Sequence, residues 1–494
     1  MKSFGFKNFR KFENFPMINL GGINILVGTN NSGKSTAIKA LMLTLLNAKR
    51  EQTSYMRYES EKSMLPPFLY VFDFSFEVLE HLYLGDFKSA LNYNDKTKEI
   101  SISFEEGGTY FSFSFTSHID ERPSAYFTKS TVYNEHLGIK YDYVFNNSDL
   151  KHRGFLPRHG SVNCKFTVPA KDMDNFRKSI EEHITIYDHL RDNSKKAYGE
   201  LAQFEKCLED CKDGKDVFTL TYDFFRGHQY KSFGGATPHC GFLKDFFSKR
   251  NNVIVKDFKS LPAVSYIETH NASHRLLLDK EDKNNYLAQT VSLYLRNCGE
   301  DPHKSETGFI SKWMREFEVG AYLDIIDVYG EAYRVNVIDS DGHNVPLAHK
   351  GTGTIQLVTL LMRLASYEAG KDRRIIVIEE PEQNMHPALQ SKLADLLYEV
   401  WKESNGNLQF VVETHSEYLV RRLQVIAARL IFDGEKYTKE VNEDFKVYYF
   451  PEEGTPYSLN FRNDGHFERK FDEGFFDEAG RSYHTLTKLE RGIR

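Results

Sequence analysis

The pattern of apolar and polar positions predicts strands and helices that follow one another along the chain. Residues 23–27, INILV, form a short apolar run typical of a buried strand. Residues 37–46 then repeat apolar side chains on one face, as an amphipathic helix does. Two further apolar runs, at 375–378 and 408–412, predict buried strands near the other end of the chain. The pattern as a whole predicts an α/β fold.

Shorter patterns lie between these runs. Residues 100–104 and 110–115 alternate apolar and polar positions around a Gly-Gly pair, which predicts a β-hairpin. Apolar residues spaced by three and four positions across 172–212 predict amphipathic helices, and we interpret 141–262 as a helical arm or lid inserted into the fold. Further expected elements are strands at 1–27, 68–78, 264–267, 324–329, 333–338, 445–450 and 457–461, and helices at 284–296 and 313–323.

Composition limits the class of protein. A chain of 494 residues predicts two or three structural units. The 14% of aromatic residues favours packed cores over disorder, and the net charge of −6 is unusual for a non-specific DNA-binding protein. Five cysteines are typical of a reducing compartment. No apolar run approaches the roughly 20 residues of a membrane helix, and the first residues lack a signal-peptide core. We therefore expect a cytoplasmic protein without a membrane partner.

The loop after the first buried strand reads GTNNSGKS and fits the phosphate-loop motif G-x-x-x-x-G-K-[ST]. Gly28 and Gly33 allow a tight turn that directs backbone N–H groups at phosphate, and the following helix adds its dipole. Lys34 would contact the β- and γ-phosphates, and Ser35, or Thr36 beside it, would offer a hydroxyl to Mg²⁺. The predicted cofactors are ATP and Mg²⁺. The predicted nucleotide-binding residues of this loop are Gly28, Asn30, Asn31, Ser32, Gly33, Lys34, Ser35 and Thr36.

The two later strands end in residues suited to phosphate chemistry. The run at 375–378 ends in Glu379 and Glu380, the Walker B pattern of four apolar residues and two acids. Glu379 would approach Mg²⁺, through a metal-bound water because it is longer than the usual Asp. Glu380 would polarise the attacking water. The other strand runs into the sequence ETHS, where His415 would hydrogen-bond the γ-phosphate.

A second glycine-containing segment opens an apolar helix just before the Walker B strand. Residues 349–356 read HKGTGTIQ, and glycines at a helix N-terminus form a second anion-binding device. Because one nucleotide already has a phosphate loop, the second device would complete the site of a partner subunit. The sequence therefore predicts a dimer with two shared sites. The acidic segment DSDG at 339–342 resembles a metal-binding motif, but we interpret it as a hairpin turn.

Together, GTNNSGKS, KGTGTIQ, EEPE, the His-Pro pair at 386–387 and ETHS resemble the ABC-type ATPases of the SMC/RecF/OLD group. The similarity covers roughly the first 50 residues and residues 345–425. The signature segment lacks the usual leading Leu-Ser, so either Thr352 or Thr354 would replace the serine. No clear Q-loop glutamine is present in the sequence. The resemblance implies that Ser35 and Glu379 hold Mg²⁺, that Glu380 is the catalytic base and that His415 is the switch histidine. It also implies that Gly351, Gly353 and Gln356 are signature residues acting in trans, and that His386 lies in a loop joining two active sites.

The resemblance also implies the architecture, a P-loop ABC-type ATPase head with a mixed β-sheet and flanking helices, an inserted helical arm or lid and a small C-terminal α+β extension. The implied domains are 1–140 for the N-terminal half of the head, 141–262 for the arm, 263–430 for the C-terminal half and 431–494 for the extension.

The function implied by the resemblance is ATP hydrolysis in a homodimer or higher oligomer. The dimer would couple hydrolysis to a separate effector, a nuclease or toxin, or to DNA, as in bacterial anti-phage defence. OLD-type relatives carry a C-terminal Toprim nuclease, but the chain after His415 is too short for one, so we expect no nuclease activity. Two alternatives remain open, a DNA-repair or recombination clamp and a low-turnover nucleotide sensor acting as a structural hub. A transporter subunit has the least support.

Overall fold

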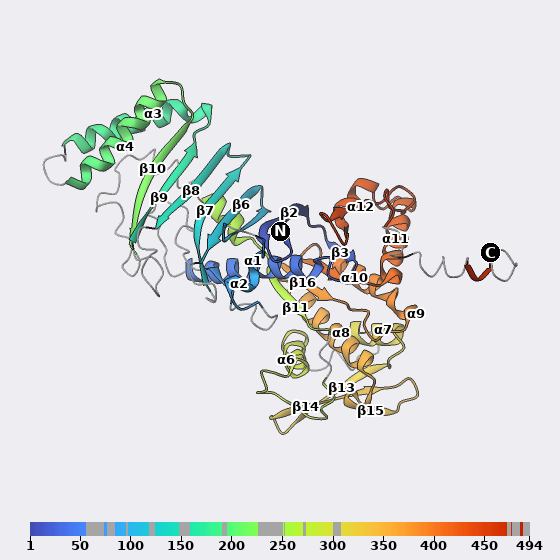
Figure 1. Ribbon diagram of the computed structural model, residues 1–494. Coiled ribbons are helices and arrows are strands. Elements are labelled where there is room, and N and C mark those ends of the chain that lie inside the picture. The colour runs from blue at the N-terminus through green and yellow to red at the C-terminus, as the bar shows by residue number, and fades with distance from the viewer. Residues whose placement is uncertain are drawn as a thin grey trace. The chain divides into compact units, whose positions relative to one another are not determined.

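The chain divides into two compact units in the computed structural model (Figure 1). The first unit comprises Met1–Asn19 and Lys39–Leu261, and the second comprises Leu20–Ile38 and Pro262–Arg494. The predicted domain bounds stay predictions. The structure describes residues 1–55, 74–76, 84–94, 97–117, 124–147, 159–189, 195–225, 250, 252–269, 273–299, 308–471, 476 and 485–487.

The first unit is built on a nine-stranded sheet with the order β10-β9-β8-β7-β6-β5-β1-β2, and β4 pairs with β7. All of its pairings are antiparallel. The strands are β1 (Ser3–Phe9), β2 (Phe12–Asn19), β4 (Phe74–Ser75), β5 (Glu99–Glu106), β6 (Thr109–Thr116), β7 (Ser124–Asn134), β8 (Ile139–Asn147), β9 (His159–Thr167) and β10 (Val217–Phe225).

The predicted hairpin is confirmed as β5 and β6. Their side chains alternate strictly between buried and partly exposed positions, so each strand has one apolar face. On the buried face the rings of Phe104 and Phe111 stack with centroids 5.1 Å apart. On the other face the hydroxyls of Ser103 and Ser112 hydrogen-bond at 2.9 Å. The apolar positions of the alternating sequence therefore face the core, and the polar positions lie on the opposite face of the sheet.

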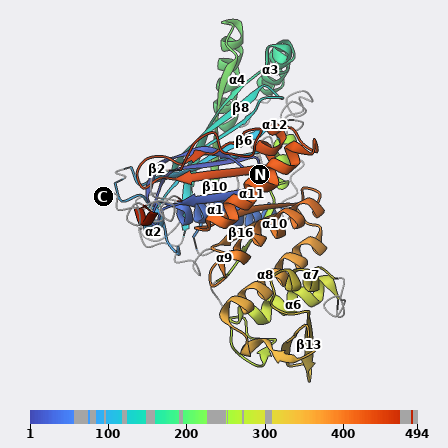
Figure 2. The same cartoon turned by 90° about the vertical axis from the view of Figure 1, so that its right-hand side faces the viewer.

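Helices α3 (Met173–His189) and α4 (Lys195–Lys212) confirm the helical pattern predicted over 172–212, and they pack together in Figures 1 and 2. The segment 141–262 also contains β9, β10 and most of β8. The predicted arm is therefore part of an extended sheet as well as a helix pair. A short helix, α2 (Phe87–Ala90), also belongs to this unit. The strand predicted at 68–78 lies largely outside the described residues.

The second unit is built on a six-stranded sheet with the order β11-β16-β17-β3-β18-β19. The first five strands are parallel, and β19 is antiparallel to β18. The phosphate-loop strand β3 therefore lies between β17 and β18. The strands are β3 (Ile23–Gly28), β11 (Ala263–Ile267), β16 (Arg374–Glu379), β17 (Leu408–Glu413), β18 (Phe445–Phe450) and β19 (Tyr457–Ser458).

A smaller antiparallel sheet in the same unit has the order β12-β14-β13, with β15 also paired to β14. Its strands are β12 (Leu278–Asp279), β13 (Tyr322–Val328), β14 (Ala332–Ile338) and β15 (Asn344–Pro346). The segment 339–342 is the turn between β14 and β15, where the Gly342 N–H donates to the Asp339 carbonyl at 2.9 Å. The interpretation of DSDG as a hairpin turn is confirmed.

Helices surround the parallel sheet and share one core with it. Helix α8 is buried along most of its length, with thirteen buried residues, because α6, α7 and α10 contact it as well as the core (Figure 2). No helix among the described residues combines the length and apolar character needed to cross a membrane. The helices that belong wholly to this unit are α6 (Tyr286–Cys298), α7 (Phe309–Glu316), α8 (Thr352–Gly370), α9 (Pro387–Gln390), α10 (Lys392–Glu403), α11 (Glu417–Phe432) and α12 (Thr438–Asp444). Helix α1 (Lys34–Tyr55) begins in this unit and belongs to the first unit from Lys39 onward.

Candidate functional site

The predicted phosphate loop leaves β3 and enters α1 in the second unit. Gly28 lies so close to β18 that an added Cβ would be 2.3 Å from the carbonyl oxygen of Phe450. Gly33 has φ 104°, a backbone conformation that side chains other than glycine rarely adopt. The two positions therefore require glycine for different reasons. At Gly28 the backbone lies too close to β18 for a side chain, and at Gly33 the loop turns with a positive φ. The hydroxyl oxygens of Thr29 and Ser32 are buried without a hydrogen-bond partner among the described residues.

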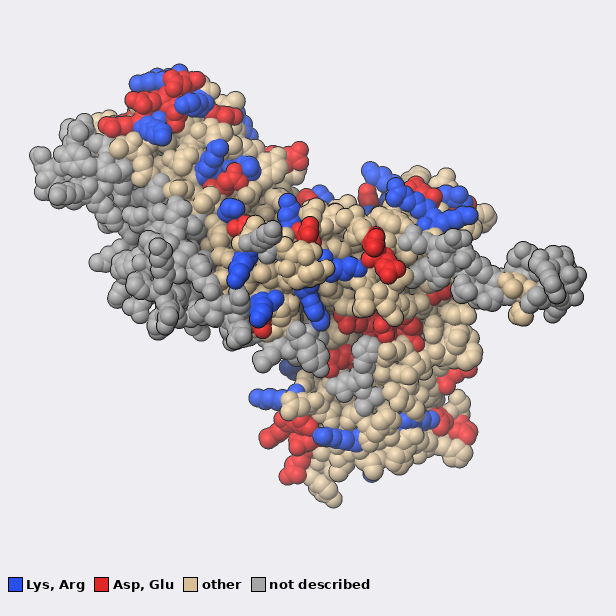
Figure 3. Space-filling model, viewed as in Figure 1, with Lys and Arg blue, Asp and Glu red and all other residues tan. Residues whose placement is uncertain are grey.

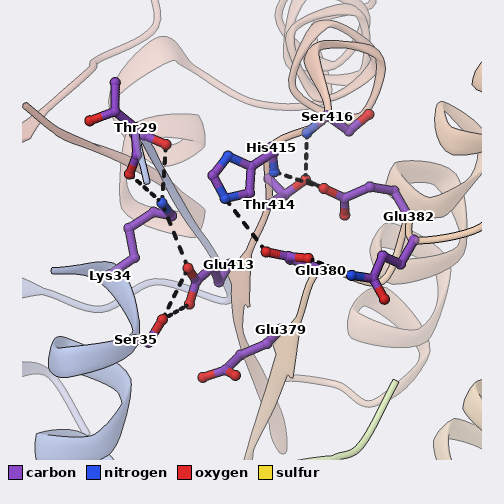
Figure 4. Close-up of polar contacts among 12 residues, drawn as sticks. Thr29, Lys34, Ser35, Glu379, Glu380, Glu382, Glu413, Thr414, His415 and Ser416 are labelled. Atoms are coloured by element: carbon purple, nitrogen blue, oxygen red, sulfur yellow. Dashed lines mark hydrogen bonds and ion pairs between the residues drawn. The ribbon is translucent and has the colours of Figure 1, made fainter. Parts of the chain in front are cut away.

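Lys34 holds its ammonium group against the loop. The Nζ atom donates to the carbonyl oxygens of Gly28 at 3.0 Å and Thr29 at 2.9 Å, and it lies 3.7 Å from Oε1 of Glu413 (Figure 4). The side chain is 3% exposed. Because a buried cation is costly unless oxygens surround it, these three groups explain how Lys34 is stabilised at the loop.

Ser35, the predicted metal ligand, contacts a carboxylate that sequence reasoning missed. Its hydroxyl donates to both carboxylate oxygens of Glu413, at 2.9 and 3.2 Å. The pKa of Glu413 is raised to about 7, chiefly by burial and then by the charge of Glu379, while Lys34 and the Ser35 hydrogen bond oppose the rise. A signal for Glu413 was present in the sequence, since it ends an apolar strand just as Glu379 does.

Glu379 lies one strand further from the phosphate loop. It ends β16, paired in register with Glu413 at the end of β17. Its Oε2 accepts a hydrogen bond from the Tyr266 hydroxyl of β11 at 3.0 Å. Burial and Glu379 together raise the pKa of that tyrosine, so the phenol keeps its proton and remains a donor. The carboxylate of Glu379 is thus directed by a tyrosine of β11.

Glu380 and His415 face each other after their strands. Glu380 has φ 46°, an uncommon conformation for glutamate, and its N–H donates to the carbonyl oxygen of Glu413 at 2.8 Å. Its carboxylate accepts from Gln383 Nε2 at 3.0 Å and lies 3.6 Å from His415 Nε2. Burial, followed by the charge of Lys34, lowers the pKa of His415, and Glu380 opposes that effect. The imidazole is therefore neutral near pH 7.

Glu382 joins the loops that follow β16 and β17. Its Oε1 accepts from the Thr414 hydroxyl and from the His415 backbone N–H, both at 2.7 Å. The Thr414 hydroxyl oxygen accepts in turn from the Ser416 N–H at 3.0 Å. The side chain is 8% exposed, burial raises its pKa, and its Oε2 has no hydrogen-bond partner among the described residues. This carboxylate fixes the backbone that carries His415.

The predicted signature residues lie at the N-terminus of α8. Gly351 is the exposed N-cap, and nothing lies within 4 Å of a Cβ added there. A Cβ added at Gly353 would be 2.5 Å from the Asn384 carbonyl oxygen. The buried Gln356 accepts through Oε1 from Asn384 Nδ2 at 3.1 Å. Gly353 and Gln356 thus contact the loop after Glu380 in their own chain.

The structure brings most of the predicted site residues to the carboxyl edge of the parallel sheet. Lys34, Ser35, Glu379, Glu380 and His415 lie there with the phosphate loop (Figure 4). His386 instead caps α9, where its Nδ1 accepts from the Ala388 N–H at 3.2 Å. The described residues contain no cluster of three or more Asp, Glu, His or Cys that could hold a metal alone.

Solved structures of SMC head domains are similar to the chain at low identity. One, an SMC head with an extended coiled coil bound to the C-terminal domain of ScpA from Pyrococcus furiosus, is 12% identical, with 99% of each chain covered and a TM-score of 0.34. An SMC head bound to the winged-helix domain of ScpA is 13% identical, covers 94% of this chain and 95% of that chain, and has a TM-score of 0.36. The SMC head from Thermotoga maritima is 12% identical, covers 93% and 98%, and has a TM-score of 0.32.

A comparison with curated proteins found no match. The family model of the AAA ATPase domain matches residues 1–420. This range contains the phosphate loop, the acids that follow β16 and the histidine that follows β17. The chain therefore belongs to the AAA ATPase domain family.

Proposed function

We propose that the second unit binds ATP with Mg²⁺ and hydrolyses it to ADP and phosphate. One observation carries the proposal. A glycine-bounded loop opens α1 beside a buried lysine, and strands β16 and β17 end at the same edge in Glu379, Glu380 and His415. Parallel sheets bind ligands outside the carboxyl ends of their strands, where this loop lies.

The residues present fit a nucleotide phosphate chain. The hydroxyls of Thr29 and Ser32 are buried without partners among the described residues, so each can donate to an incoming oxygen. Lys34 already places its positive charge over the loop. Ser35 and Glu379 would hold Mg²⁺, which neutralises charge on the phosphates when it is bound.

The chain's own groups then divide the remaining work. Glu380, with its carboxylate directed by Gln383, would accept a proton from the attacking water. His415 is neutral near pH 7, so its Nε2 can carry a proton toward a phosphate oxygen. Glu382 fixes the backbone that carries that ring, because its carboxylate accepts from the His415 N–H. Because the three roles differ, substitution of each residue should affect hydrolysis in a different way.

The resemblance of the sequence to the SMC/RecF/OLD group supports a dimer in which the N-terminus of α8 completes a partner's site. The open surroundings of Gly351 favour such a contact. The same resemblance supports coupling to a separate effector in anti-phage defence. On the face shown in Figure 3, basic and acidic side chains are interspersed, and no observation on the described residues favours the DNA clamp.

Single-turnover hydrolysis tests the proposal. Wild-type protein in excess over radiolabelled ATP should release phosphate, and Glu380→Gln should bind ATP with similar affinity but release phosphate far more slowly. Glu435→Gln, an exposed acid on the segment between α11 and α12, is the matched control and should behave as wild type. Near-zero rates that are equal in wild type and Glu380→Gln would contradict hydrolysis and favour the nucleotide sensor.

A further inference from the structure

The arrangement of strands places Glu413 nearer to the phosphate loop than Glu379. Strand β17 pairs directly with β3, whereas β16 pairs with β17 on its far side. Neighbouring strands are about 4.8 Å apart, so Glu379 starts one strand spacing further out. The two acids are paired in register, and both therefore end at the same level of the sheet.

The side-chain contacts also place Glu413, rather than Glu379, beside the phosphate loop. Glu413 accepts both hydrogen bonds that the Ser35 hydroxyl makes to it, at 2.9 and 3.2 Å, and lies 3.7 Å from Lys34 Nζ. Glu379 instead accepts from Tyr266 at 3.0 Å. Glu413 is thus the acid that contacts Ser35, the predicted metal ligand, although the Walker B pattern predicts Glu379 as the acid beside the metal.

We propose that Glu413 is the positioning residue of the Mg²⁺ site. The proposal rests on the proposed function, because it concerns the cation bound with ATP. A serine hydroxyl that binds a cation through its oxygen needs an acceptor for its proton. Glu413 supplies that acceptor and so directs the Ser35 lone pairs away from itself, toward the phosphate side. Its negative charge also favours a cation beside it.

A consequence follows for nucleotide binding without metal. The carboxylate of Glu413 lies near Lys34, the residue expected to contact the phosphates. When Glu413 is ionised and Mg²⁺ is absent, its negative charge would repel the phosphate chain and compete for Lys34. With Mg²⁺, the repulsion becomes attraction through the cation. Glu413 would therefore make ATP affinity depend on Mg²⁺.

The test measures ATP affinity by calorimetry in Mg²⁺ and in EDTA. Glu413→Gln, which keeps an acceptor oxygen for Ser35, should reduce the affinity gain from Mg²⁺ by roughly ten- to hundredfold, as removal of such supporting groups does. Its affinity in EDTA should equal or exceed that of wild type. Mn²⁺ binding in the presence of ADP, followed by electron paramagnetic resonance, should weaken in parallel. Glu417→Gln, an exposed acid at the start of α11, is the control.

Distinct outcomes would overturn the inference or the proposed function. Glu413→Gln with a wild-type gain from Mg²⁺ would overturn the inference, as would equal losses in Mg²⁺ and EDTA, which indicate a structural role only. If Glu413→Gln does not fold, Glu413→Asp replaces it: the shorter carboxylate should stay below wild type in the affinity gain from Mg²⁺ because it no longer reaches Ser35, and a wild-type gain would overturn the inference. Absence of ATP binding by wild type, or equal binding by Lys34→Ala, would overturn the proposed function itself.

Discussion

At the scale of single residues, Lys34 has its charge stabilised before any nucleotide arrives, by two loop carbonyls and Glu413. We expect Lys34→Ala to weaken ATP binding by at least about tenfold, because a hydrogen bond to a charged group contributes about 1.5–3 kcal/mol. Fluorescent ATP titration measures the loss. Lys439→Ala, an exposed lysine on α12, should leave the affinity unchanged. Equal affinities for both variants would rule out the phosphate role of Lys34.

Glu382 gives a prediction on stability. Glu382→Ala leaves the Thr414 hydroxyl and the His415 N–H without their acceptor, and each such buried group costs about 1–3 kcal/mol. Glu382→Gln keeps an acceptor oxygen and removes the cost of burying a charge, so its free energy of unfolding should stay near that of wild type. Urea denaturation compares the three proteins. A loss in the Gln variant as large as in the Ala variant would show that the charge itself is needed.

The residues predicted from sequence were those whose signal is local. GTNNSGKS is contiguous, and the acids of β16 directly follow an apolar run. Glu413 ends an apolar strand, but its contact with Ser35 was not predicted because it joins segments far apart in sequence. The same holds for the contacts of Glu382 and Tyr266. One sequence does not reveal that β17, rather than β16, is the neighbour of β3. The roles of the site residues stay predictions.

At the scale of elements, the N-terminus of α8 offers a test of a partner contact. Gly351→Asp should fold normally, because its surroundings are open and Asp is a favourable N-cap. If this helix end meets the phosphates of a partner's ATP, the new charge should lower hydrolysis by roughly tenfold for every ~1.4 kcal/mol of repulsion. ATP binding should persist.

The matched control for this prediction lies on the same helix. Gly370→Asp places the same charge at the other end of α8, where a Cβ also meets no atom within 4 Å. It should hydrolyse ATP at the wild-type rate in the same assay. Wild-type hydrolysis by Gly351→Asp would contradict the contact. Gly353 is a poorer position for this test, since any side chain there would press on Asn384 of its own chain.

Elements were predicted where the periodicity was regular. The hairpin of β5 and β6 and the helices α3 and α4 followed from alternation and from three-and-four spacing. Strand β8 carried a usable signal, since Ile139, Tyr141 and Tyr143 are buried at every second position. The neighbouring helical pattern dominated the interpretation of 141–262, and β9 and β10 pair through contacts distant in sequence.

At the scale of the whole molecule, the main prediction is association. Glu380→Gln with ATP and Mg²⁺ should sediment as a dimer or larger species, because ATP held between two chains is no longer hydrolysed. The same protein with ADP, and Lys34→Ala with ATP, should sediment as the smaller species. Identical sedimentation under all three conditions would contradict an ATP-closed dimer.

The position of β3 between β17 and β18 also has a consequence for synthesis of the protein. The Asn24 side chain of β3 donates to the carbonyl oxygen of Phe410, a partner 386 residues away in sequence. During synthesis β3 leaves the ribosome early, and it cannot pair until its neighbours β17 and β18 have been made. At about 5–20 residues per second, this delay is on the order of tens of seconds. A chain that stops early would lack the sheet that supports the loop, so ATP binding would distinguish finished chains from nascent ones.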